Sequence, residues 1–314
     1  MGRAPLHVVA GVLHDSRGRV LLAQRPSGKH LAGLWEFPGG KCEPDEAPAD
    51  ALRRELHEEI GVQVGALEKL IALPWRYAEK SICLDVYMVR DHAGTPHGRE
   101  GQALQWVEPD RLADIAMPPA DRPVVTALRL PRRYVITPDP AEGIEAFLHV
   151  LQHVLDAGEK LIQLRSKRLP ADALRRVAAQ ARALTARSGA CLLLNEHAQL
   201  AAELGLDGVH LTARMLLGSA ARPLPAPLLV GASCHTAREL AHAAAIGVDF
   251  AVLGSVATTG SHPDQPALGW QRFAALCADA PLPVFALGGM RIDDLEVAVE
   301  AGAQGIAGIS AFWR

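Results

Sequence analysis

Three glutamates, Glu55, Glu58 and Glu59, stand at positions i, i+3 and i+4 of a segment with helical patterning, so they share one helix face. Like charges at this spacing repel by a few tenths of a kcal/mol per exposed pair, and by more when partly buried. A cation should therefore balance them, and Mg²⁺ (or Mn²⁺) fits because it prefers carboxylates, water and substrate phosphates. The plain alternative is a solvated acidic helix face.

The helix that must carry these glutamates is expected to run from about Pro48 to Ile60. Pro48 suits the first helical position, Asp50 suits the first turn, and Gly61 suits the position just after the last turn. An apolar stripe beside the glutamates is expected to face the core; it consists of Ala49, Leu52, Leu56 and Ile60.

Strand-like segments surround this helix. His7–Leu13 and Val20–Gln24 are joined by the turn residues 15–18, which predicts a hairpin. Further strands are expected at Ile82–Val89 and Leu104–Val107. A short helix over Pro123–Leu130 is expected to close this part of the chain.

The spacing of fixed residues around the glutamates is specific. From Gly40 to Val62 the sequence resembles the Nudix box, G-x5-E-x7-R-E-U-x-E-E-x-G-U with U a bulky aliphatic residue, and every fixed position matches. This match removes the plain alternative. The resemblance implies a loop–helix–loop that hydrolyses a diphosphate linked to another moiety. It also implies metal ligation by Glu55, Glu58, Glu59 and the carbonyl of Gly39, with these glutamates and Arg54 forming the catalytic set. Arg54 would orient a glutamate, and Glu46 would hold the loop to the helix.

Residues 33–41, GLWEFPGGK, resemble the MutT branch of the family, the 8-oxo-dGTP diphosphatases, and the likeness extends over residues 5–130. It implies that Glu100, in the segment GREGQ, approaches the metal. It implies substrate contacts from Arg25, His30, Phe37, Gly40, Lys41 and Asp121. Trp75 and Tyr77 are further candidates for stacking on a base. Asp121 stands in PPAD where the branch has a base-reading Asn, and an ionised Asp only accepts hydrogen bonds.

Beyond the prolines of Met117–Arg133 the chain alternates strictly between short apolar runs and helical stretches. The eight expected strands are Tyr134–Thr137, Leu161–Arg165, Cys191–Asn195, Gly208–Leu211, Leu228–Ser233, Phe250–Val256, Pro283–Gly288 and Gly305–Ser310. Continuous apolar strands separated by helices indicate a parallel sheet, and eight units indicate a (β/α)₈ barrel. The predicted fold class is α/β: a Nudix α/β/α sandwich with a mixed sheet at 1–130, then a TIM-type barrel at 133–314.

In order and spacing, the strand ends of this second part resemble thiamine phosphate synthases and the related thiazole tautomerases. The likeness implies a phosphate or ligand site made by Arg165, Lys167, Asn195, Ser233, Thr259, Gly288 and Gly289. The sequence departs from the synthases where Glu196 and Met215 replace two Asp metal ligands and His262 replaces a Lys. It departs from the tautomerases where Ser255 replaces a His. A degenerate barrel, an altered enzyme and a working thiamine-pathway enzyme all stay open.

Composition limits the partners. The chain has 314 residues with 32 Lys and Arg against 35 Asp and Glu, a formal charge of −3, which disfavours a surface for polymeric nucleic acid or anionic membrane. The five cysteines are scattered without zinc spacing, and no apolar run reaches the length of a membrane span. The N-terminal residues show no apolar signal-peptide core. We expect a cytoplasmic protein.

The resemblance to the MutT branch therefore implies an enzyme that uses Mg²⁺ to hydrolyse 8-oxo-dGTP to 8-oxo-dGMP and pyrophosphate, so that an oxidised nucleotide does not reach polymerases. The expected partners are a nucleoside triphosphate substrate and, in the second part, a thiazole or thiamine phosphate. Three alternatives remain: hydrolysis of thiamine-pathway or other pyrophosphates, a bifunctional enzyme with synthase or tautomerase activity, and a second part that only binds a phosphate ligand.

Overall fold

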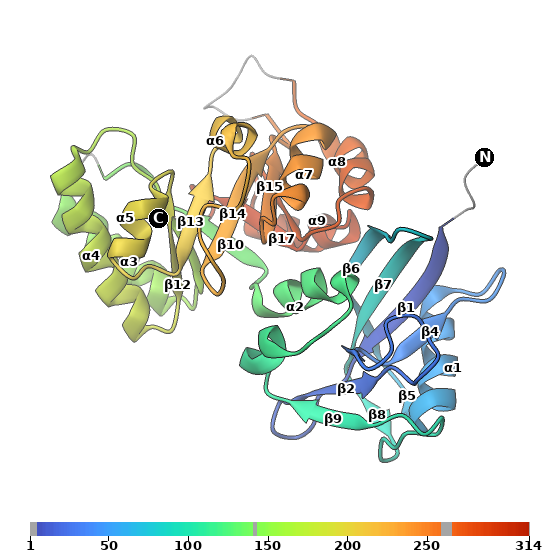
Figure 1. Cartoon of the computed structure of the whole chain (residues 1–314). Helices are drawn as coiled ribbons and strands as arrows, with labels where there is room; N and C mark the ends of the chain where they lie inside the picture. Colours follow the sequence, from blue (N-terminus) through green and yellow to red (C-terminus); the bar gives the residue numbers. More distant parts are fainter. Residues whose placement is uncertain (1–4, 141–142, 259–265, 314) are drawn as a thin grey trace. The chain divides into compact units, whose positions relative to one another are not determined.

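The computed structural model describes residues 5–140, 143–258 and 266–313. The chain forms two compact units, Met1–Arg129 and Leu130–Arg314 (Figure 1). Among the described helices, none is both long and apolar enough to cross a lipid bilayer.

The first unit is built on a mixed four-stranded sheet in the order β4-β1-β7-β6. The central pair, β1 and β7, runs parallel, whereas β4 and β6 are antiparallel to their neighbours. Smaller sheets have the orders β3-β2-β9 and β5-β8. The strands are β1 (Leu6–Val12), β2 (Val20–Gln24), β3 (Trp35–Glu36), β4 (Gly39–Lys41), β5 (Gln63–Val64), β6 (Leu67–Arg76), β7 (Ser81–Val89), β8 (His92–Ala93) and β9 (Leu104–Val107).

Two α-helices cover opposite faces of the four-stranded sheet (Figure 1). Helix α1 (Pro48–Ile60) packs on one face against Val9 of β1, and helix α2 (Arg122–Arg129) packs on the other through Val124 and Val125. Two 3₁₀ turns, η1 (Pro109–Asp114) and η2 (Pro119–Asp121), lead into α2. This arrangement confirms the α/β/α sandwich with a mixed sheet.

Helix α1 begins and ends where the sequence predicts. Gly61 takes the left-handed conformation with φ of 74°, and its N–H donates to the carbonyl of His57, which satisfies the last turn. The buried stripe contains Ala51, Leu52, Leu56 and Ile60; Ala49 is only partly buried. The expected stripe was therefore wrong at Ala49, because the helix rests on the sheet along the neighbouring line of residues.

The expected hairpin of β1 and β2 was also wrong. The tight turn forms, with the N–H of Leu21 donating to the carbonyl of Leu13, but the two strands then enter different sheets. Strand β1 pairs with β4 and β7, whereas β2 pairs with β3 and β9. Because both edges of β1 are used by distant strands, the local turn does not set the pairing.

The second unit is a closed barrel of eight parallel strands, β10 to β17, each paired with its neighbours in sequence and β17 paired with β10. This confirms the predicted barrel. The strands are β10 (Arg133–Ile136), β11 (Leu161–Leu164), β12 (Cys191–Asn195), β13 (Gly208–Leu211), β14 (Leu229–Cys234), β15 (Phe250–Gly254), β16 (Val284–Leu287) and β17 (Gly305–Gly308). The helices are α3 (Ile144–Asp156), α4 (Ala171–Arg187), α5 (Ala198–Glu203), α6 (Ala213–Gly218), α7 (Ala237–Ala245), α8 (Gly269–Ala278), η3 (Ile292–Asp294) and α9 (Leu295–Glu300).

Successive side chains of a barrel strand point alternately to the inside of the barrel and to the helices around it, so they belong to two different apolar clusters. On β10, Tyr134 and Ile136 join Phe250 and Phe285 in one apolar cluster formed by the strands. Val135, between them, packs with residues of α3 and α4 in another cluster. Both faces of every strand are thus buried, which explains why these segments read as continuous apolar runs.

Candidate active site

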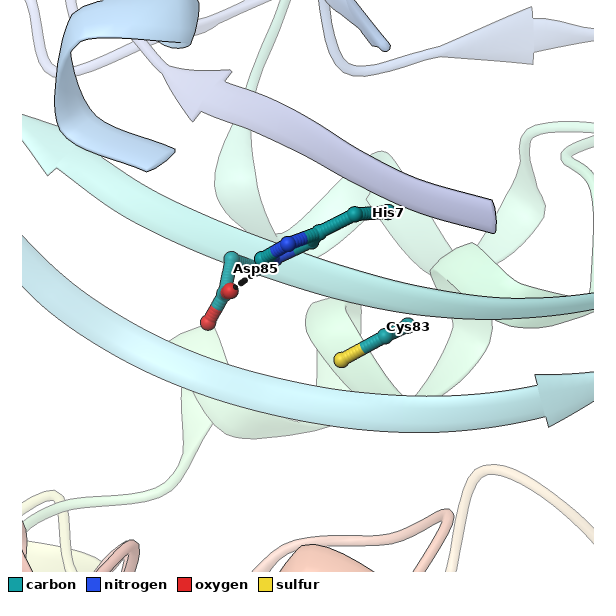
Figure 2. Close-up of side chains that lie close together, drawn as sticks. All are labelled: His7, Cys83 and Asp85. Carbon is teal, nitrogen blue, oxygen red and sulfur yellow. Dashed lines mark hydrogen bonds and ion pairs between the residues drawn. The ribbon is translucent and has the colours of Figure 1, made fainter. Parts of the chain in front are cut away.

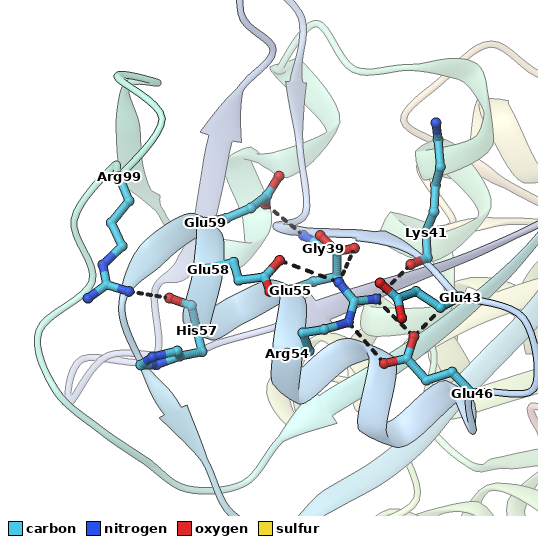
Figure 3. Close-up of polar contacts among 10 residues, drawn as sticks. All are labelled: Gly39, Lys41, Glu43, Glu46, Arg54, Glu55, His57, Glu58, Glu59 and Arg99. Carbon is cyan, nitrogen blue, oxygen red and sulfur yellow. Dashed lines mark hydrogen bonds and ion pairs between the residues drawn. The ribbon is translucent and has the colours of Figure 1, made fainter.

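Arg54 holds the centre of the carboxylate cluster on helix α1 (Figure 3). Its guanidinium binds Glu46 in a bidentate pair, with Nε and Nη2 at 2.9 and 2.8 Å from the two carboxylate oxygens. This charge-assisted pair lowers the pKa of Glu46 to about 2. Nη2 also donates to the carbonyl of Lys41 at 3.0 Å. Arg54 therefore fixes the loop before α1 to the helix, as the sequence resemblance implied for Glu46.

The remaining nitrogen of Arg54 reaches along the helix. Nη1 donates to Glu55 at 2.8 Å and to Glu58 at 3.4 Å. Hydrogen bonds to the carboxylates of Glu46 and Glu55 raise the pKa of Arg54 well above its usual value, and burial opposes this rise only in part. Arg54 thereby partly balances two of the three glutamates.

Glu59 lies in a different environment from the other two glutamates. Its carboxylate accepts a hydrogen bond from the N–H of Gly39 at 3.3 Å, and burial raises its pKa to about 7. The Gly39 hydrogen bond opposes this rise. The charges of Glu36, Glu100 and Glu55 add to it. Glu59 is the point where the electrostatic need for a cation is strongest.

The loop that follows β8 folds over the C-terminal end of α1. Arg99 donates from its backbone N–H to the carbonyl of Glu59 at 2.9 Å and from Nη1 to the carbonyl of His57 at 2.9 Å. Gln102 Nε2 donates to the carbonyl of Glu59 at 3.0 Å. These bonds satisfy the free carbonyls of the last turn and place Glu100 close enough to act on Glu59 electrostatically. The side chain of Glu100 is paired with Lys29 at 3.0 Å.

The carboxylates of Glu55, Glu58 and Glu59 share a helix face but do not converge. Within the described residues, their oxygens do not all come within 4.8 Å of one another. Arg54 holds the first two, and Gly39 holds the third. The donor set consists of hard oxygens with excess negative charge, which fits Mg²⁺ or Mn²⁺. A bound ion would have to draw the three carboxylates together against their repulsion.

Gly39 and Gly40 let strand β4 pass close to both β1 and α1. A side-chain carbon on Gly40 would lie 2.1 Å from the Glu55 carboxylate, so that carboxylate packs directly on the glycine backbone. A side-chain carbon on Gly39 would lie 2.2 Å from the carbonyl oxygen of Val9, and φ there is +154°. The two glycines are therefore needed for different reasons. A larger residue at position 40 would displace the Glu55 carboxylate, whereas a larger residue at position 39 would clash with the backbone of Val9.

A second group of charged residues joins the carboxylate cluster to the PPAD segment. Arg25 pairs with Glu36 and donates from Nε to the carbonyl of His30 at 2.7 Å. Asp121 is 6% exposed, and its burial raises the pKa of the carboxyl well above its usual range. The charge of Glu36 adds to this rise and that of Arg25 opposes it. Burial therefore favours the neutral carboxylic acid form of Asp121.

Glu36 is a site residue that sequence reasoning missed. Burial raises its pKa, and its charge acts on both Glu59 and Asp121, so it links the two groups. The available signal was that Glu36 is an acidic residue inside the otherwise apolar run WEFP, and that this run immediately precedes the pair Gly39 and Gly40.

An open pocket of about 450 Å³ lies beside Arg25 and is lined by residues including Gln24, Gly33 and Gln102. His30 is exposed and stands edge-on to Tyr77, with ring centroids 5.5 Å apart. The side chain of Lys41 points away from the glutamates (Figure 3). Phe37 is only 3% exposed and belongs to the core between the sheet and α2, so it offers almost no surface to a ligand in this conformation.

In the barrel, the expected residues cluster by topology at one end, because the carboxyl ends of parallel strands meet there. Asn195 ends β12, Arg165 follows β11, and Ser233 lies near the end of β14. Gly288 and Gly289 follow β16 with φ of +104° and +68°. Lys167 is exposed, and its N–H donates to Asp139. Thr259 and His262 lie outside the described residues.

Two buried polar groups lie among these strand ends. His210 is held between the Tyr134 hydroxyl at 3.2 Å and the Ser233 hydroxyl at 3.0 Å, and burial lowers its pKa to about 3. Gln163 donates to Asn195 at 2.8 Å, while its Oε1 is buried with no hydrogen-bond donor among the described residues. Sequence reasoning did not place Gln163 in the site.

The departures at the barrel's expected metal position are visible in the fold. Glu196 follows β12 with φ of +69° and is exposed, and Met215 lies in α6 and is half-buried. A thioether is not a ligand for Mg²⁺, so this end of the barrel lacks one of the two carboxylates implied for a synthase.

Comparison with known proteins assigns both units to families. The NUDIX domain model matches residues 9–127, and the thiamine monophosphate synthase model matches residues 133–312. The chain is 40% identical to the CTP pyrophosphohydrolase of Escherichia coli over 39% of its own length and 90% of that protein. It is 38% identical to the 8-oxo-dGTP diphosphatase of Haemophilus influenzae over 41% of its length and 94% of that protein. It is 34% identical to the thiamine-phosphate synthase of Methanoculleus marisnigri over 57% of its length and 85% of that protein.

The two glycines of β4 give a matched pair of substitutions. Gly40→Ala is expected to keep the fold and displace the Glu55 carboxylate, because the flexible end of that side chain can move. Its affinity for Mn²⁺ should fall by roughly tenfold or more. Gly39→Ala is expected to strain the backbone by about 1–3 kcal/mol and to lower Tm by several degrees. Manganese titration and thermal unfolding separate the two effects; equal loss of stability in both variants would contradict this account of Gly40.

Proposed function

We propose, for a chain that belongs to the Nudix family through its first unit and to the thiamine monophosphate synthase family through its second, that the first unit is the catalytic one. It hydrolyses a nucleoside triphosphate to the monophosphate and pyrophosphate with the help of Mg²⁺, for which Mn²⁺ can substitute. The proposed substrate is 8-oxo-dGTP.

The observation that carries this proposal is the unbalanced carboxylate face of α1. Burial and like charges raise the pKa of Glu59 to about 7, so an added divalent cation is strongly favoured there. Glu55, Glu58 and the Gly39 carbonyl complete the proposed ligand set, with Glu100 alongside. When bound, the ion supplies positive charge to the phosphate oxygens and makes a bound water more acidic.

The chain's own groups have distinct roles in this proposal. Arg54 orients Glu55 and holds the loop that carries Gly39 and Gly40. One of the glutamate carboxylates accepts the proton of the attacking water. Arg25, which lines the open pocket, meets the phosphate chain, and His30 and Lys41 are further proposed contacts to the substrate.

Asp121 supports a base-reading role in an unexpected way. As a neutral acid it offers one O–H donor and one carbonyl acceptor, which is the pattern of the Asn amide that it replaces. The O–H can donate to O6 of 8-oxoguanine while the carbonyl accepts from N1–H. Burial, by favouring the neutral form, reduces the conflict expected from an ionised Asp.

A second candidate substrate is CTP, and the same neutral Asp121 favours it. Cytosine presents an acceptor at N3 beside a donor at its 4-amino group, which matches the O–H and carbonyl of a carboxylic acid. The chain is also similar to a protein named CTP pyrophosphohydrolase. Because both bases fit one carboxylic acid, discrimination must come from the rest of the pocket.

A side-by-side measurement of kcat/KM for 8-oxo-dGTP, dGTP and CTP tests the substrate. We expect 8-oxo-dGTP to be preferred over dGTP by more than about tenfold. Glu58→Gln should reduce turnover on every nucleotide by orders of magnitude while Tm changes little, because the side chain is exposed and faces the proposed metal. A smaller preference would contradict the proposal that the enzyme clears oxidised nucleotides. Full activity in Glu58→Gln would contradict the assignment of Glu58 to the catalytic metal site.

The protonation state of Asp121 predicts a pH profile. In the wild-type protein, kcat/KM should fall as pH rises through the elevated pKa of Asp121, because the ionised form loses its donor. Asp121→Asn keeps one donor and one acceptor, so its kcat/KM at pH 6 should stay within about threefold of wild type. Its alkaline decline should be weaker. Identical pH profiles for the two proteins would show that Asp121 does not read the base as a neutral acid.

We propose that the barrel binds a thiazole or thiamine phosphate rather than catalysing synthase chemistry. The unpaired Oε1 of Gln163 and the positive-φ pair Gly288 and Gly289 support a retained ligand site. Arg165, Lys167, Asn195 and Ser233 are its other proposed contacts, together with Thr259. The missing carboxylate at Met215 argues against metal-assisted pyrophosphate transfer.

Thermal shift of the full chain tests the barrel's role. Thiazole phosphate and thiamine phosphate should raise Tm, whereas Gln163→Leu should reduce the shift by removing the unpaired amide. Glu58→Gln is the matched control and should keep the shift, because it alters only the other unit. No shift with either phosphate would favour a structural barrel, and measurable synthase turnover in the wild-type chain would overturn the non-catalytic proposal.

A further inference from the structure

Three potential metal ligands, His7, Cys83 and Asp85, meet on the central strand pair of the first unit (Figure 2). His7 lies on β1, and the other two lie on β7. One nitrogen of the imidazole, the sulfur of Cys83 and one oxygen of Asp85 all lie within 4.8 Å of one another. These residues are not part of the Nudix box, and the proposed hydrolysis does not use them.

The strand register explains why the three side chains converge. His7 is directly opposite Cys83 in the parallel ladder of β1 and β7, so their side chains leave the same face of the sheet. Asp85 comes two residues after Cys83 and therefore also points to that face. The convergence of the three side chains is set by the register of β1 and β7, so a rearrangement of the loops would not disturb it.

Burial and charge prepare this cluster for a cation. The Asp85 side chain is 7% exposed and lies between two basic groups. His7 Nε2 is 2.5 Å from Oδ2, and Lys69 Nζ is 2.7 Å from Oδ1. Lys69 thus holds one carboxylate oxygen and leaves the other directed at His7. The His7 side chain is 39% exposed, which gives an ion a path from solvent.

The donor atoms select the class of metal. Imidazole nitrogen, thiolate sulfur and carboxylate oxygen together suit Zn²⁺ and similar transition metals, whereas Mg²⁺ takes oxygen ligands. Burial raises the pKa of the Cys83 thiol, so its thiolate needs a positive partner at neutral pH. The all-oxygen glutamate face of α1 and this mixed cluster should therefore prefer different ions.

We propose that His7, Cys83 and Asp85 form a binding site for one Zn²⁺-class divalent transition-metal ion, with water in the fourth position. Binding displaces the hydrogen bond between His7 and Asp85 and releases the thiol proton to solvent. The occupied site joins β1 to β7 by coordination. Lys69 stays on the outer oxygen of Asp85 and orients the carboxylate.

Cobalt(II) titration of the full-length reduced protein, in excess Mg²⁺, distinguishes this site from the glutamates. A thiolate ligand gives Co²⁺ an intense near-ultraviolet charge-transfer band, and carboxylates do not. We expect this band to saturate at about one equivalent and to be bleached by Zn²⁺. Cys83→Ser should abolish it, and Asp85→Asn should weaken Co²⁺ affinity by roughly tenfold or more.

Cys191→Ser, in strand β12 of the barrel, is the matched control and should keep the full band. A second measurement needs no variant: Zn²⁺ should slow iodoacetamide alkylation of Cys83 in the wild-type chain, as followed by peptide mass spectrometry. The proposal is overturned if wild type shows no thiolate band, if the band survives in folded Cys83→Ser, or if Zn²⁺ leaves Cys83 alkylation unchanged. The last result would leave His7, Asp85 and Lys69 as an ordinary partly buried ion-pair cluster.

Discussion

The first unit depends on one electrostatic problem: helix α1 carries Glu55, Glu58 and Glu59 on the same face. A helix with such a face is tolerable only if other groups compensate. Arg54 compensates part of the charge from within the helix, and it does so while bonded to Glu46 and to the carbonyl of Lys41. Because one guanidinium serves both tasks, the shape of the glycine loop and the position of the carboxylates are set together.

The negative charge that Arg54 does not compensate lies at Glu59, and the residues around Glu59 can be understood from this charge. The loop carrying Arg99 and Gln102 closes the end of α1 with three hydrogen bonds. Burial, together with the negative charges of Glu36 and Glu100, raises the pKa of the Glu59 carboxyl to about 7. A structural cluster would avoid such an accumulation. An accumulation that a divalent ion relieves fits the proposed metal-dependent hydrolysis, because without the ion the carboxylates repel one another.

Sequence predicts the local elements and the fold class of this structure well, and it fails where one strand or one side chain depends on particular distant neighbours. Helix α1, its Gly61 terminus and the eight barrel strands follow from short patterns, and the structure confirms them. The predicted pairing of β1 with β2 was wrong because β4 and β7, which are distant in sequence, pair with the two edges of β1. Glu36 was missed, and the effect of burial on the pKa of Asp121 was not predicted, for a related reason: burial depends on tertiary neighbours that spacing alone does not reveal.

The packing of the barrel core does not depend on the residues at the carboxyl ends of its strands. Its interior cluster of Tyr134, Phe250 and Phe285 depends on alternation within the strands, not on the residues at their ends. The exposed Glu196, which follows β12, can therefore vary without cost to the core, whereas Met215 of α6 packs against the apolar cluster outside the strands. The buried Oε1 of Gln163 is different, because an acceptor without a donor costs free energy in a purely structural barrel. A ligand that donates a hydrogen bond to this oxygen would remove that cost, in line with the proposed binding role.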